Sequence, residues 1–162
     1  MALPTTSSAR LKANNILFQL NTTGSTYKDF SWDLISFAVK SEDASNDQTT
    51  FLDATLGGAV DVYAEAEMIQ STESTSLWQY LYSNPGKELL FRYSPWGTGT
   101  AAGNANTADK PGYTGTIRLP RLLAPGLGGA ASVDGTFGSD TVRFDIVGSL
   151  TVDTAATTWT RS

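Results

Sequence analysis

The sequence predicts a mainly β domain, a β-sandwich or partly closed barrel with one short flanking α-helix. Three observations favour this class: short segments of alternating apolar and polar residues, joins rich in Gly and Thr, and a single brief stretch with helical spacing. A chain of 162 residues can bury a core without disulfides or metals. We expect one domain over residues 1–162, with a flexible arm at 1–15, a long loop at 40–58 and a polar tail at 151–162.

The strongest strand signal is Ala59–Ile69. Read with a period of two, one side carries Val60, Val62, Ala64, Ala66 and Met68, and the other Asp61, Tyr63, Glu65, Glu67 and Ile69. Successive strand residues point to opposite faces, so this strand has an apolar face and a face charged with one sign only. A helix would scatter the three carboxylates around its circumference. The acidic face is either an ordinary solvated surface or one that borders something negative without binding it.

Two strands are expected before the central one. Met1–Asn15 is too polar to order by itself, and Ile16–Leu20 predicts a short strand. Tyr27–Lys40 predicts a second, longer strand. Its alternation sets Ile35, Phe37 and Val39 against Leu34, Ser36, Ala38 and Lys40.

The polar segment SEDASNDQ opens the long loop at 40–58, in which Thr49–Leu56 regains β-type residues before Gly57-Gly58. Long loops in compact domains are often kept for binding, and a mobile surface loop is the alternative.

Ser76–Tyr82 is the one convincing helix. Ser76 followed by Gln79 fits a capping box, with Thr72 or Ser74 as alternative caps. The apolar residues that share one helical face are Leu77, Trp78 and Leu81. We interpret Trp78 as a core anchor, and Asn84-Pro85-Gly86 as the end of the helix.

The second half of the chain predicts further strands joined by small-residue loops. The expected strands are Glu88–Tyr93, Gly112–Arg121, Ala130–Phe137 and Val142–Val147. Ser94–Lys110 is expected to be a loop, and the polar tail contains Trp159.

Composition excludes several function classes. The chain has neither cysteine nor histidine, which removes thiolate chemistry, a Ser-His-Asp triad and the commonest metal ligand. A net charge of −5 argues against a basic nucleic-acid footprint. No apolar run is long enough to span a membrane, and MALPTTSSAR does not resemble a signal peptide, so we expect production in the cytoplasm.

No catalytic or metal-binding constellation is predicted, and the sequence implies no enzyme activity and no cofactor. Glu65 and Glu67 project to one strand face about 7 Å apart, but a glycosidase pair usually comes from different elements. Asp43, Asp47 and Asp53 lack the glycine and terminal glutamate of a calcium loop. A sugar-stacking platform would use Trp96 and Tyr113.

The order of these features resembles the major tail tube proteins of long-tailed bacteriophages. The residues that carry the resemblance are AVDVYAEAEMI, SLWQYLYSNPG, ELLFRYSP and YTGTIRLPRLLAPGLGGAASVDGTFGSDTVRFDIVGSLTV, within about Ser31–Thr154. The resemblance implies a structural virion protein that assembles into stacked hexameric rings around a channel through which DNA passes without specific binding. Assembly would take place in the host cytoplasm, and the other partners would be the tape measure, terminator and distal tail proteins. No membrane partner is implied.

The resemblance also implies roles for two groups of residues. The channel-lining residues would be Asp61, Glu65 and Glu67. The ring-stacking loop would present Glu42, Asp43, Asn46, Asp47 and Phe51. The alternatives are another β-rich virion component, such as a tail terminator, head–tail joining or capsid decoration protein, and a monomeric carbohydrate-binding module.

Overall fold

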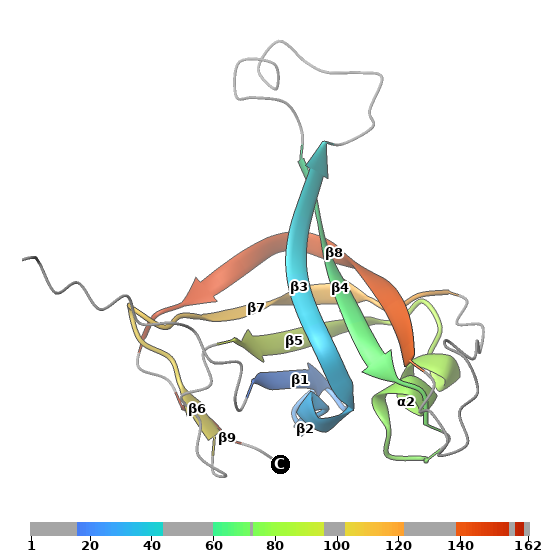
Figure 1. Cartoon of the computed structure of the whole chain (residues 1–162). Helices are drawn as coiled ribbons and strands as arrows, with labels where there is room; N and C mark the ends of the chain where they lie inside the picture. Colours follow the sequence, from blue (N-terminus) through green and yellow to red (C-terminus); the bar gives the residue numbers. More distant parts are fainter. Residues whose placement is uncertain are drawn as a thin grey trace, which may run out of the picture.

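The protein is a mainly β structure built on one curled antiparallel sheet (Figure 1). The computed structural model describes residues 16–43, 60–71, 73–95, 103–121, 139–155 and 158–160. Seven strands form the main sheet in the order β2-β1-β5-β7-β8-β4-β3, and β6 pairs with β9 in a small ribbon. The predicted fold class, mainly β with one short helix, is confirmed.

The strands of the main sheet are β1 (Leu17–Asn21), β2 (Tyr27–Asp29), β3 (Leu34–Asp43), β4 (Val60–Ile69), β5 (Glu88–Ser94), β7 (Gly112–Arg118) and β8 (Ser139–Asp153). The remaining elements are the 3-10 helix η1 (Ser31–Asp33), the helix α2 (Leu77–Ser83), and the ribbon strands β6 (Gly103–Ala105) and β9 (Thr158–Thr160).

The sheet curls so that β3 and β4 pass across the layer formed by β1, β5 and β7 (Figure 1). Phe37 of β3 lies 4.8 Å from Phe18 of β1 and 6.2 Å from Phe91 of β5, measured between ring centroids. The Tyr93 hydroxyl donates a hydrogen bond to the Phe37 carbonyl at 3.1 Å, and burial raises the pKa of Tyr93. Strands at opposite ends of the strand order therefore share one core.

The central strand and the helix form as predicted. In β4, Ala64, Ala66 and Met68 are fully buried, so the alternation identified the core face correctly. The Ser76 hydroxyl accepts a hydrogen bond from the Gln79 N–H at 3.2 Å, which confirms Ser76 as the N-cap. The apolar helix face that packs into the core is Leu77, Trp78 and Leu81, which confirms Trp78 as a core residue.

The prediction of one strand over Tyr27–Lys40 is wrong, because η1 separates β2 from β3. The Asp29 carboxylate accepts a hydrogen bond from the Ser31 N–H at 2.9 Å, and this local bond turns the chain. Asp33 then caps α2, since its carboxylate accepts a hydrogen bond from the Leu77 N–H at 2.6 Å. The segment therefore joins the two layers instead of continuing within one.

Ile35 does not lie on the buried face with Phe37, contrary to the alternation. The pairing of β3 with β4 shifts between Leu34 and Ser36, and this bulge turns Ile35 outward, where its side chain is 54% exposed. Leu34 packs against the core instead.

The tail predicted from Thr151 is wrong in two respects. β8 continues to Asp153, past a second register shift at Gly148, whose φ of 78° suits glycine. Trp159 of β9 is only 3% exposed, and the backbone carbonyl of Thr160 accepts a hydrogen bond from Gln19 Nε2 at 2.7 Å. The loop predicted at Ser94–Lys110 also contains β6, the partner of β9. The end of the chain therefore covers the side of β1 that faces away from the main core.

Other predictions fall on residues that the structure does not describe. They are the arm Met1–Asn15, the segment Thr49–Leu56, the strand Ala130–Phe137 and Trp96.

Gly112 allows Trp159 and Asn106 to pack closely against β7. A Cβ at this position would lie 2.4 Å from Trp159 Cη2 and 2.5 Å from Asn106 Nδ2. We expect Gly112→Ala to lower the free energy of unfolding by about 1–3 kcal/mol through overpacking. Denaturant titration measures this, with Thr114→Ala on the same strand as the control. Equal midpoints for Gly112→Ala and the wild type would contradict the packing described.

Candidate functional site

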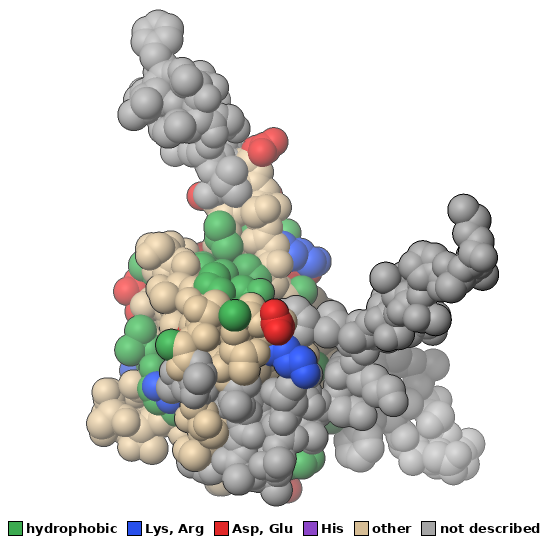
Figure 2. All heavy atoms as spheres, turned by 90° about the vertical axis from the view of Figure 1, so that its left-hand side faces the viewer, with side chains coloured by type: hydrophobic (Ala, Val, Ile, Leu, Met, Phe, Trp, Pro, Cys, Tyr) green, Lys and Arg blue, Asp and Glu red, His purple; other side chains and the backbone are tan. Residues whose placement is uncertain are grey.

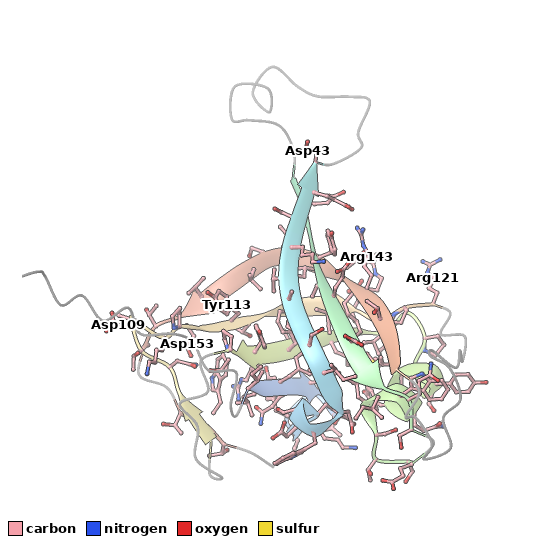
Figure 3. All side chains as sticks on the ribbon, viewed as in Figure 1. Asp43, Asp109, Tyr113, Arg121, Arg143 and Asp153 are labelled. Atoms are coloured by element: carbon pink, nitrogen blue, oxygen red, sulfur yellow. The ribbon has the colours of Figure 1, made fainter. Side chains whose placement is uncertain are left out.

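The side of β3, β4 and β8 that faces away from the buried Ala64 and Ala66 carries a group of charged side chains, among them Arg143 (Figure 3). We call this surface the charged face; it comprises Lys40, Glu42, Asp61, Tyr63, Glu65, Glu67, Arg143 and Asp145. Lys40 lies opposite Tyr63, and Tyr63 lies opposite Asp145. The sheet register therefore brings residues distant in sequence onto one surface.

The predicted channel-lining residues all lie on this charged face, although it is not purely acidic. β4 supplies only carboxylates, but its neighbours β3 and β8 supply Lys40 and Arg143. Charge of one sign, as expected, is therefore found on β4 itself. The surface that β4 forms together with β3 and β8 carries both signs. Carboxylates still outnumber cations on this face.

Each cation on the charged face is held by carboxylates of the same face. Lys40 Nζ contacts Glu65 Oε2, and this hydrogen bond raises the pKa of Lys40. Arg143 contacts Glu42 Oε1, which lowers the pKa of Glu42, and Arg143 Nε lies 3.4 Å from Asp145 Oδ1. All of these pairs remain open to solvent.

Arg143 reaches Glu42 by crossing the ring of Tyr63, with its guanidinium carbon 4.0 Å from the ring centroid. This cation–π contact and the two carboxylates hold the guanidinium on three sides. Arg143 thereby connects β8 to β3 across β4, near the base of the projecting hairpin (Figure 3).

Asp61 and Glu67 differ from the other carboxylates of the charged face, because neither forms an ion pair with another described residue. Asp61 lines a polar hollow of about 520 Å³ together with Arg143 and Asp145. Asp61 therefore stands beside a cation, Arg143, that is already paired with carboxylates.

Two of the residues predicted for the ring-stacking loop belong to a strand. Glu42 and Asp43 form the end of β3, where Asp43 pairs with Val60 of β4. The strand extends further than predicted because β4 continues to pair with it up to this point. Asn46, Asp47 and Phe51 lie outside the described residues.

The two edge strands of the main sheet differ in length. β2 has three residues and pairs with β1 alone among the described strands, and further along β1 the Phe18 carbonyl accepts a hydrogen bond from Phe30 N–H at 2.9 Å while Phe18 N–H donates to the Ser31 hydroxyl at 2.8 Å. At the other edge, the ten-residue β3 pairs with β4 alone among the described strands, and we call this side of β3 the open edge. Two large apolar side chains are exposed at the start of this edge, Trp32 (81%) and Ile35 (54%).

An apolar groove of about 400 Å³ lies between β3 and the layer beneath it, lined by Ala38, Val39, Tyr93, Pro95, Tyr113 and Leu150. Hydrophobic side chains gather on this side of the molecule, below the projecting hairpin (Figure 2). Tyr113, predicted for a sugar platform, is half-buried here with its ring 6.4 Å from that of Tyr93. Its proposed companion, Trp96, lies outside the described residues.

Two observations bear on metal binding and catalysis. Among the described residues, no three acidic side chains come together in a way that could hold a metal ion. Glu65, one of the paired carboxylates considered for catalysis, forms an ion pair with Lys40.

In the described part of the chain, no helix has the length and apolar character needed to cross a bilayer.

No family model, curated protein or solved structure matches this chain.

Sequence reasoning missed the cations of the charged face and the exposed residues of the open edge. Lys40 and Arg143 could be placed on strand faces from alternation alone, but strand order decides which faces lie side by side. Trp32 gave no signal, and alternation placed Ile35 on the wrong face, because η1 and the adjacent bulge interrupt the strand pattern on which the prediction depends.

Proposed function

We propose that this chain is a structural subunit, the major tube subunit of a long-tailed bacteriophage tail, which assembles into stacked six-membered rings. The charged face would border the channel through which DNA passes. The observation that carries the proposal is the open edge of β3 beside a face with an excess of carboxylates. The resemblance in the order of strand, helix and strand supports the same class.

The open edge suits self-association. An unpaired strand edge is a template for another chain, and folded proteins usually shorten, charge or cover such edges. Here β3 is ten residues long, and two apolar side chains are exposed, Trp32 in the preceding η1 and Ile35 near the start of the strand. A neighbouring copy seated on this edge would remove from water both the exposed apolar surface and the backbone of β3 that no described strand pairs.

The excess of carboxylates suits a passage for DNA. Phosphate contacts with Lys and Arg supply most of the non-specific affinity of proteins for DNA. A wall on which carboxylates outnumber cations repels the phosphate backbone, so DNA can move along it without adhering. The face also lies on the outward side of the β3–β4–β8 layer and so remains available when the opposite side packs in the core.

Sedimentation and negative-stain microscopy of the purified chain over a range of concentrations test this proposal. We expect long, open-ended tubes built of stacked rings. Discrete rings or trimers that do not stack would favour a terminator, joining or decoration protein. A monomer at every concentration would contradict the proposal.

A further inference from the structure

We propose that Glu42, Glu65 and Asp145 mask Lys40 and Arg143, so that these two cations of the charged face cannot hold a polyanion. The inference rests on the proposed function only for the identity of that polyanion, duplex DNA. The inference concerns individual ion pairs, whereas the proposed function depends only on an overall excess of negative charge.

The carboxylates of the charged face fall into two groups, those in ion pairs with Lys40 or Arg143 and those in no ion pair with a described cation. Lys40 and Arg143 lie on opposite sides of β4, and each contacts a carboxylate of another strand. Asp145 adds a second carboxylate to Arg143, and Tyr63 covers the guanidinium plane. Asp61 and Glu67, on the same face, pair with no described cation. On the charged face, Lys40 and Arg143 are therefore each matched by a neighbouring carboxylate.

Stability alone gives little reason for these pairs. They are exposed, with side-chain exposures of 48% and 33% for Lys40 and Glu65, and exposed ion pairs contribute little to the free energy of unfolding. Their effect on DNA binding would be larger, because each cation released from its carboxylate could contact a phosphate. Each added phosphate contact steepens the salt dependence of the logarithm of the binding constant by about 0.9.

The test compares two triple variants with the same change in net charge. The unmasking variant carries Glu42→Gln, Glu65→Gln and Asp145→Asn. The control carries Asp61→Asn, Glu67→Gln and Glu73→Gln, which neutralise carboxylates that pair with no described cation. Binding to a labelled DNA duplex is followed by fluorescence anisotropy at increasing salt, on unassembled protein whose folding is checked by thermal melting.

We expect the unmasking variant to bind duplex DNA at least about tenfold more tightly than the control at low salt, with a salt slope steeper by up to about 1.8. Adding Lys40→Gln and Arg143→Gln to the unmasking variant should abolish the gain. If the unmasking variant does not fold, Glu65→Gln alone releases Lys40 and should steepen the slope by about 0.9.

Equal binding by the two triple variants would overturn masking, since only net charge would then matter. Because DNA binding is measured on unassembled protein, this result is independent of tube formation. If the wild-type chain forms tubes but the two triple variants bind DNA equally, only the masking proposal is refuted. If the triple variants differ in DNA binding but the wild-type chain forms no tubes, only the proposed function is refuted.

Discussion

Replacing Trp159 with alanine should lower the free energy of unfolding by about 3–5 kcal/mol, the range typical of a large buried aromatic residue. The indole is 3% exposed and lies against Gly112 and Asn106, with the Arg92 guanidinium 5.5 Å from its ring centroid. β9 has three residues, and Trp159 is the one of them that is buried, so its side chain is the apolar anchor of this strand.

Denaturant titration followed by circular dichroism measures the effect of Trp159→Ala. The matched control is Trp32→Ala, which removes the same side chain from a position that is 81% exposed and should change stability by less than about 0.5 kcal/mol. Similar losses for the two variants would contradict the burial of Trp159 and the assignment of β9.

Replacing both Trp32 and Ile35 with lysine should abolish self-assembly while leaving the chain folded. Trp32 in η1 and Ile35 in β3 are both exposed, so charge at these positions costs little in the isolated chain. Lysine is a common device by which folded proteins prevent edge strands from pairing with another chain. The expected result is a monomer at concentrations at which the wild-type chain forms tubes.

Sedimentation velocity and thermal melting check this prediction together. Tyr82→Lys is the control, because Tyr82 is also an exposed aromatic residue, at 55%, but belongs to the last turn of α2 and not to η1 or β3. We expect the control to assemble. Tubes formed by the Trp32→Lys, Ile35→Lys variant would show that the open edge of β3 is not the contact between copies.

Local patterns predicted those elements whose signals are complete within a few residues. The alternation of Ala64, Ala66 and Met68 identified the core face of β4, and Ser76 marked the start of α2. The same reasoning failed at Asp29 and Ser31, where a side-chain hydrogen bond overrides a run of β-type residues. A three-residue strand such as β9 has no period to detect, so Trp159 was assigned to a tail.

The charged face shows why a site is harder to predict than a strand. Asp61, Glu65 and Glu67 share one face because alternation along a single strand places them there. The pairing of Lys40 with Glu65 depends on which strand lies beside β4 and in which register, and no local pattern encodes this. Arg143 reaches Glu42 across more than one hundred residues of sequence, so its contact follows only from the completed sheet.

The most direct measurement is an electron cryomicroscopy map of the assembled particle at side-chain resolution. The account predicts that Asp61, Glu65 and Glu67 lie on the inner wall of the channel and that the start of β3 is covered by a neighbouring copy. A map with these three carboxylates on the outer wall, or a chain that never associates with itself, would contradict it.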